Sequence, residues 1–174
     1  MLLAFGLLGI TVPALAAPPD LPLYREFRDW QTACDNTGRC EAKGFSREEG
    51  SDAISVVRVT REAGPAGAIE IVLESDTGFD RADIRIAGGG SKRGGPRVDP
   101  TLWSGESAGD GGGQLMLRDP AGAVAFLSGL RNADSLRLGK AGTVSLDGMT
   151  AALLAMDDAQ GRVGTATALI RRGD

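Results

Sequence analysis

Four polar residues near the carboxyl end of the chain could together carry chemistry or bind a ligand: Asp157, Asp158, Gln160 and Arg162. The apolar spacing before them predicts a helix whose last turn contains both aspartates, where the helix dipole disfavours each negative charge by about 0.3 to 1 kcal/mol. We therefore expect a guanidinium from Arg162, Arg171 or Arg172 to lie within salt-bridge distance of one carboxylate. Two interpretations stay open, a structural salt bridge and a binding site for a ligand or partner.

Any catalysis by this chain would have to proceed without imidazole, because the sequence contains no histidine. Ser-His and Cys-His nucleophile pairs and zinc sites with imidazole ligands are excluded on that ground. The lysines are Lys43, Lys92 and Lys140, and none follows a serine at the Ser-x-x-Lys spacing. Adjacent aspartates on a helix point about 100° apart, so Asp157 and Asp158 cannot flank one bond as glycosidase acids do. We predict neither a metal site nor a cofactor.

The amino-terminal segment is typical of a secretory signal peptide. The first 17 residues carry no charged side chain, and an apolar run from Leu2 to Val12 precedes Pro13 and the small residues that end at Ala17. The run is shorter than the roughly 20 residues of a membrane-spanning helix. We expect cleavage after Ala16 or Ala17, a periplasmic location and no integral membrane segment afterwards. Because no Lys or Arg follows Met1, an uncleaved anchor is the alternative.

Residues 18–174 are long enough for one domain with a single core. Of the chain, 42% is hydrophobic and 24% charged, and the formal net charge is −4 with an isoelectric point near 4.9. This acidic balance disfavours a nucleic acid as partner.

The two cysteines, Cys34 and Cys40, are separated by five residues whose types favour a turn. An even number of cysteines in an exported chain favours a disulfide. Redox motifs use two intervening residues, and two thiolates alone form no structural zinc site. We therefore predict a Cys34–Cys40 disulfide that closes a small hairpin.

Alternation of apolar and polar residues predicts the strands of a half-buried sheet. The predicted strands are Glu26 to Cys34, Arg39 to Phe45, Ile54 to Thr60, Ile69 to Glu74 and Ile84 to Ile86. From Gly88 to Gly113, 10 of 26 residues are glycine and Lys92, Arg93 and Arg97 cluster, which predicts a long mobile loop. A phosphate cradle is the alternative there, although no P-loop or dinucleotide-binding motif occurs. Trp103 is predicted to be a buried anchor rather than an exposed ring that stacks on a ligand.

The last third changes to helical spacing. Asp119-Pro120 is a favourable start for a helix of about 11 residues, and Asp147-Gly148 precedes a second helix that Gly161 ends. A hairpin from Leu136 to Leu146 separates the helices, and Thr165 to Ile170 is predicted to be a strand. The fold class is therefore α+β, an antiparallel β-rich sheet or sandwich with two short helices in the C-terminal third.

Two blocks of sequence carry a resemblance to a known family. They are Phe27 to Asn36 with Cys40 and Gly44, and Ser145 to Gly148, Ala151 to Leu154, Met156-Asp157, Gln160 to Arg162, Gly164-Thr165 and Ala168 to Ile170. The chain resembles the N-terminal half of an uncharacterised secreted family of Gram-negative bacteria, domain of unknown function 1176. The first block is also similar to the invasion-associated locus B proteins. The resemblance implies export, a disulfide and a β-rich fold, and it brings no established activity.

We predict a non-catalytic periplasmic binding or protein-interaction module. Its partner would be an envelope protein or a small ligand, contacted through the glycine-rich loop or the corner at Asp157, Gln160 and Arg162. The alternative is an envelope hydrolase that uses carboxylates without histidine.

Overall fold

The computed structural model describes residues 21–46, 53–88, 98–106 and 112–173. The expected signal peptide, residues 1–17, and the basic residues Lys92, Arg93 and Arg97 lie outside the described residues. Within the described part, no helix has the length and apolar character needed to cross a membrane.

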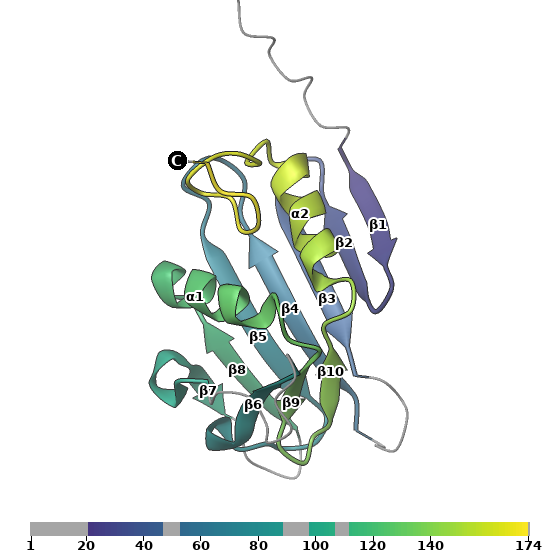
Figure 1. Cartoon of the computed structure of the whole chain (residues 1–174), viewed down its shortest axis with the longest axis vertical. Coiled ribbons are helices and arrows are strands. Elements are labelled where there is room, and N and C mark those ends of the chain that lie inside the picture. Colours follow the sequence, from purple (N-terminus) through teal and green to yellow (C-terminus); the bar gives the residue numbers. More distant parts are fainter. Residues whose placement is uncertain (1–20, 47–52, 89–97, 107–111, 174) are drawn as a thin grey trace, which may run out of the picture.

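The described residues form two sheets, and the larger one is antiparallel and has seven strands (Figure 1). Consecutive strands lie side by side from β1 to β5, and β8 and β7 complete the opposite side. In spatial order the strands are β1 (Leu23–Phe27), β2 (Trp30–Cys34), β3 (Cys40–Phe45), β4 (Ser55–Arg61), β5 (Ile69–Ser75), β8 (Gly113–Leu117) and β7 (Ser104–Glu106).

The second layer covers one face of this sheet. It contains a three-stranded antiparallel sheet in the order β10 (Thr143–Ser145), β9 (Ser135–Leu138) and β6 (Ile84–Ala87). Helices α1 (Pro120–Leu130) and α2 (Met149–Ala159) lie above the small sheet in Figure 1, with α1 packed on β5 and α2 on β1 to β3. Short 3-10 turns, η1 (Arg81–Asp83) and η2 (Pro100–Leu102), precede β6 and β7. The α+β antiparallel fold class is confirmed.

The local signals that predicted the helices also explain where they begin. The Asp119 carboxylate accepts the Gly122 N–H at 2.6 Å, and Pro120 is the first residue of α1, which has the predicted 11 residues. Helix α2 begins after Gly148, whose φ of 97° lies in the left-handed region. A Cβ at Gly148 would overlap the Phe27 carbonyl oxygen, so glycine permits the β1–β2 turn to pack against the start of α2.

Three local predictions differ from the structure. The single strand predicted over Glu26 to Cys34 is two strands, because the chain turns at Arg28, whose φ is 55°. The predicted loop from 88 to 113 contains η2 and β7 among its described residues. The strand predicted over Thr165 to Ile170 was wrong, since this segment forms turns and bends.

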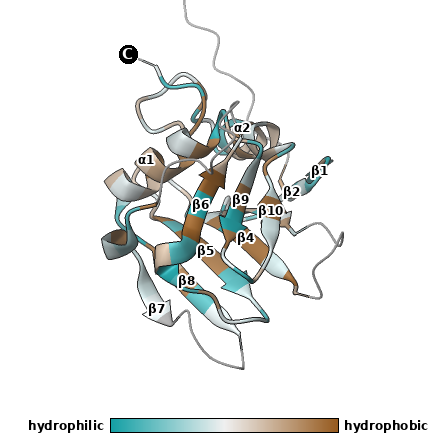
Figure 2. Ribbon diagram, turned by 60° about the horizontal axis from the view of Figure 1, so that its bottom comes forward, coloured by the Kyte–Doolittle hydropathy of each residue, from teal (hydrophilic) through white to brown (hydrophobic). Residues whose placement is uncertain are grey.

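The core lies between the two layers. Figure 2 shows hydrophobic residues along the central strands β4 and β5. The inward Val57, Val59, Ile71 and Leu73 of these strands are fully buried, together with Leu153 and Met156 of α2. Trp103 is confirmed as a buried anchor, with its ring 5.1 Å from that of Phe126 at an interplanar angle of 82°.

The disulfide is confirmed: Cys34 and Cys40 are directly opposite each other on β2 and β3, with Cα atoms 4.0 Å apart.

We predict that unreduced native protein contains no reactive thiol. Replacing both cysteines with alanine should lower the free energy of unfolding by about 2.4 kcal/mol, the loop-entropy value for seven residues. Thiol titration and urea unfolding measure the two quantities. A free thiol in native, non-reduced protein would contradict the bridge.

Trp30 lies flat over Gly44, its neighbour on β3, so that a Cβ at Gly44 would overlap the indole ring. We predict that Gly44→Ala lowers the free energy of unfolding by about 1 to 3 kcal/mol, as overpacking of a core does. Gly129→Ala is the matched control, because a Cβ there meets Ile86 Cδ1 at an ordinary 3.5 Å. That variant should be neutral or up to about 1 kcal/mol more stable. Equal urea midpoints for the two variants would contradict this account.

Candidate functional site

Asp157, the first of the predicted site residues, is completely buried on α2 and holds three chain segments together. Its Oδ1 accepts Arg61 Nη1 at 2.9 Å from β4. Its Oδ2 accepts the main-chain N–H groups of Leu169 at 2.8 Å and Ile170 at 2.9 Å. The same Arg61 donates through Nη2 to the Thr167 carbonyl at 2.6 Å. Helix, sheet and C-terminal segment therefore meet at one carboxylate and one guanidinium.

Arg61 is the salt-bridge partner of Asp157, so the expectation that Arg162, Arg171 or Arg172 would supply it was wrong. The reason is that Asp157 faces the large sheet rather than the end of its own helix. Arg61 shares the inward face of β4 with Val57 and Val59, and only 2% of its side chain is exposed. The signal was present in the sequence, because Arg61 continues the alternation of Val57 and Val59. Burial lowers the pKa of Arg61 to about 10, assisted by the charge of Arg162 and opposed by Asp157.

Gln160 and Arg162 lie at the same corner and donate to main-chain carbonyls. Gln160 Nε2 donates to the Gly38 carbonyl at 2.8 Å, in the turn of the disulfide hairpin. Arg162 donates to the carbonyls of Gly64 and Pro65, in the β4–β5 turn. Burial also lowers the pKa of Arg162, while Asp157 opposes this change.

Asp158, in contrast, is exposed and does not join this corner. The structure thus brings Asp157, Gln160 and Arg162 together, with Asp157 fully buried and Arg162 only 5% exposed. The Asp157 carboxylate, the Gln160 Nε2 and the Arg162 guanidinium are bonded to the protein, so a ligand would have to displace existing bonds there, whereas the buried Gln160 Oε1 has no hydrogen-bond partner among the described residues. The second predicted contact surface, the glycine-rich loop, has its basic residues outside the described part.

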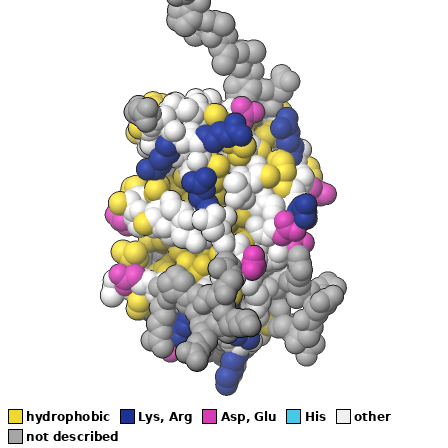
Figure 3. Space-filling view, in the orientation of Figure 1, with side chains coloured by type: hydrophobic (Ala, Val, Ile, Leu, Met, Phe, Trp, Pro, Cys, Tyr) yellow, Lys and Arg dark blue, Asp and Glu magenta, His cyan; other side chains and the backbone are white. Residues whose placement is uncertain are grey.

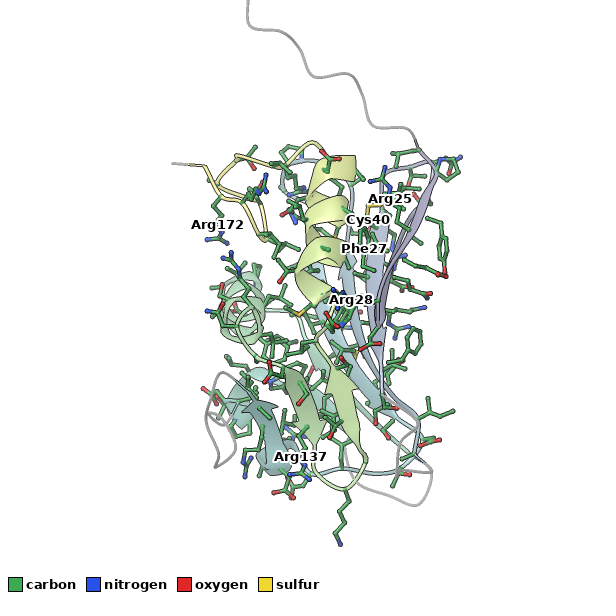
Figure 4. The ribbon with its side chains drawn as sticks, turned by 45° about the vertical axis from the view of Figure 1, so that its right-hand side comes forward. Arg25, Phe27, Arg28, Cys40, Arg137 and Arg172 are labelled. Atoms are coloured by element: carbon green, nitrogen blue, oxygen red, sulfur yellow. A yellow bond between two sulfur atoms is a disulfide. The ribbon has the colours of Figure 1, made fainter. Side chains whose placement is uncertain are left out.

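A groove that sequence reasoning missed lies on the helix-covered side of the molecule. Its volume is about 1280 Å³, and it runs between the start of α2, the β9–β10 hairpin and the β1–β2 turn. Figure 4 shows Arg28 beside the first turn of α2 and Arg137 on the small sheet below it. The polar and charged residues that line it include Arg28, Asp134, Ser135, Arg137, Lys140, Thr143 and Asp147.

The charges of the groove are only partly paired. Arg28 Nη1 lies 2.9 Å from Asp147 Oδ2 at its upper end, and the Asp29 N–H donates to the Asp147 carbonyl at 3.2 Å. Figure 3 shows basic and acidic side chains adjoining beside α2. Among the described residues, Arg137 and Lys140 form no salt bridge, and both are exposed. The groove therefore presents cations that no described acidic residue neutralises.

This arrangement is suited to binding. Proton-transfer or nucleophilic chemistry would need converging acids or a desolvated lysine. Here Lys140 is exposed at the hairpin turn, and Asp147 is held by Arg28. In the described part of the chain, no three or more Asp, Glu or Cys residues gather as a metal site would require.

Comparison with known proteins gives a family but no activity. The family model described as "Protein of unknown function (DUF1176)" matches residues 24–174. The uncharacterized protein YpfG of Escherichia coli (strain K12) is 30% identical over 158 residues, covering 88% of this chain and 43% of YpfG. The chain thus spans less than half the length of this curated relative. No solved structure matches, and the likeness to invasion-associated locus B proteins is not among these findings.

We predict that Asp157→Asn lowers the free energy of unfolding by about 3 to 5 kcal/mol, because it leaves the buried Arg61 charge without a counter-ion. Urea unfolding followed by circular dichroism measures this loss. The matched control is Asp158→Asn, one residue away on an exposed position, which should change stability by less than about 0.5 kcal/mol.

The double variant Asp157→Leu with Arg61→Met removes both buried charges and should recover part of the loss. Similar destabilisation by Asp157→Asn and Asp158→Asn would show that the buried pair does not hold this corner.

Proposed function

Since the chain belongs to the DUF1176 family, whose description supplies no activity, we propose that it is an exported, non-catalytic binding module. Its binding surface in this proposal is the groove between α2, the β9–β10 hairpin and the β1–β2 turn, and its partner belongs to the cell envelope. The observation that carries the proposal is the pair of exposed cations, Arg137 and Lys140, in that groove, neither of which forms a salt bridge with a residue that the structure describes.

Export is supported by the sequence and by the covalent structure. The uncharged apolar segment that ends at Ala17 has the features of a cleavable leader. Disulfides persist in oxidising compartments such as the bacterial periplasm and are rare in the cytosol. The buried Cys34–Cys40 bridge therefore fits a protein that functions outside the cytosol.

Recognition of a partner segment is supported by the size and construction of the groove. Its volume of about 1280 Å³ exceeds the roughly 300 to 1,000 Å³ of pockets that enclose small molecules. Its walls come from a helix and a hairpin. Trp30 of β2 holds the hairpin to the large sheet by donating from Nε1 to the Ser145 carbonyl of β10 at 2.8 Å. Rigid walls reduce the ordering cost of binding.

The experiment uses the full chain with its leader in a Gram-negative host, carrying Thr143→p-benzoylphenylalanine in the groove. We expect the protein in the periplasmic fraction, with a mass that corresponds to cleavage after Ala16 or Ala17. Illumination of whole cells should give a discrete crosslinked species at this position, because Thr143 is exposed and lines the groove.

The control carries the same photoreactive residue at Ala125, an exposed position of α1 that does not line the groove. This variant should be exported equally and give no discrete species. A leader-bearing cytosolic product would contradict export. Crosslinking from Ala125 but not from Thr143 would contradict the groove as the binding surface.

A further inference from the structure

The outward face of the small sheet contains an unfavourable charge arrangement. Arg85 on β6 is directly opposite Arg137 on β9 in the antiparallel register. Like charges directly opposite each other destabilise a sheet. Arg85 Nη1 donates to the carbonyls of Ala82 at 2.6 Å and Ile84 at 3.0 Å, which directs its guanidinium along its own strand.

The described acids near this face form no salt bridge with Arg137. Asp83 lies 3.9 Å from Arg85 Nη2, and Asp147 is paired with Arg28. Asp134 also lines the groove but forms no salt bridge among the described residues. Two unneutralised cations, Arg137 and Lys140, therefore face one free acid in a protein whose net charge is −4. The net charge of the groove lining is therefore positive, whereas that of the whole chain is negative.

The spacing along the wall matches an extended polypeptide. Ser135 and Arg137 lie two residues apart on β9, and both line the groove, whereas Leu136 and Leu138 point into the core. Alternate residues on a strand are about 6.7 Å apart, which is also the repeat of alternate side chains in an extended peptide. Ser135 and Arg137 therefore offer two successive positions to such a peptide, and Lys140 lies in the turn that follows the strand.

From these contacts we propose that the groove selects an extended acidic peptide segment, with Arg137 and Lys140 as the residues that determine charge selectivity. This inference rests on the groove being the binding surface proposed above, and it adds the chemical class of the ligand. A guanidinium can bind a carboxylate through two parallel hydrogen bonds, which makes Arg137 the stronger determinant.

The test measures fluorescence anisotropy of three 12-residue probes with the full mature chain. The probes are fluorescein-labelled peptides in which alanine alternates with glutamate, glutamine or lysine. We expect binding of the glutamate peptide, with affinity that falls as NaCl rises because exposed charge pairs are screened. Arg137→Gln should weaken this affinity about tenfold and Lys140→Gln several-fold, as expected for charge-assisted contacts.

Arg171→Gln is the matched control, because it removes an exposed arginine that does not line the groove. It should leave the affinity unchanged. Circular dichroism should show that none of the three variants melts below the wild type, and Arg137→Gln should melt at the same temperature or slightly higher because it removes the repulsion with Arg85. Equal binding of the glutamine and glutamate peptides, or an Arg137→Gln variant that binds like wild type, would overturn the acidic selectivity. The function proposed above would survive that result if Thr143 still forms its crosslink in cells.

A lipid phosphate is the competing anion, and it is tested with phosphatidylglycerol vesicles against phosphatidylcholine vesicles. We expect no difference in co-sedimentation between the two. Binding to phosphatidylglycerol that Arg137→Gln abolishes, together with no peptide binding, would replace the peptide by a membrane surface. Absence of both peptide and vesicle binding would overturn the inference, while loss of the Thr143 crosslink in cells would overturn the proposed function itself.

Discussion

The buried ion pair between Arg61 and Asp157 is the interaction on which the rest of the arrangement depends. Removing two charges from water costs several kcal/mol per ion, and the protein recovers this only when the remaining hydrogen-bonding positions are filled. Here the carboxylate also accepts from Leu169 and Ile170, and the guanidinium also donates to Thr167. Satisfying both charges therefore fixes the C-terminal segment as well as the helix that carries Asp157.

The position of the groove follows from how α2 is held at its two ends. The ion pair fixes its carboxyl end against β4. Nearer its start, Thr32 of β2 donates to the Ala152 carbonyl at 2.8 Å, and Trp30 donates to the Ser145 carbonyl just before the helix. These contacts place the first turn of α2 beside the β9–β10 hairpin. The groove is thus a consequence of packing between β2 and α2, segments that are more than 100 residues apart in the sequence.

That separation explains which features the sequence could predict. The capped start of α1 and the cysteine turn are encoded by neighbouring residues, so local patterns were sufficient. Arg61, the partner of Asp157, lies 96 positions away in the sequence. Its only sequence signal was that an arginine occupies a position of β4 where the alternation predicts a buried side chain. The segment from Thr165 to Ile170 resembles a strand in composition, but the N–H groups of its last two residues are taken by the Asp157 carboxylate. These hydrogen bonds to the Asp157 side chain therefore take the place of the strand-to-strand hydrogen bonds that a β-strand at this position would form.

The two clusters of charged residues differ in how many of their charges are paired with other groups of the protein. The cluster at the corner stabilises the fold, whereas the cluster in the groove is available for binding. At the corner, Arg61, Asp157 and Arg162 are buried and bonded to the protein's own groups, so a ligand would have to replace bonds already formed. In the groove, Arg137 is exposed, opposes another arginine across the sheet and has no acidic partner within the described residues. A like charge at this position weakens the sheet slightly. An anionic ligand would relieve that repulsion, so a charge that the described part of the fold leaves without a partner is suited to binding.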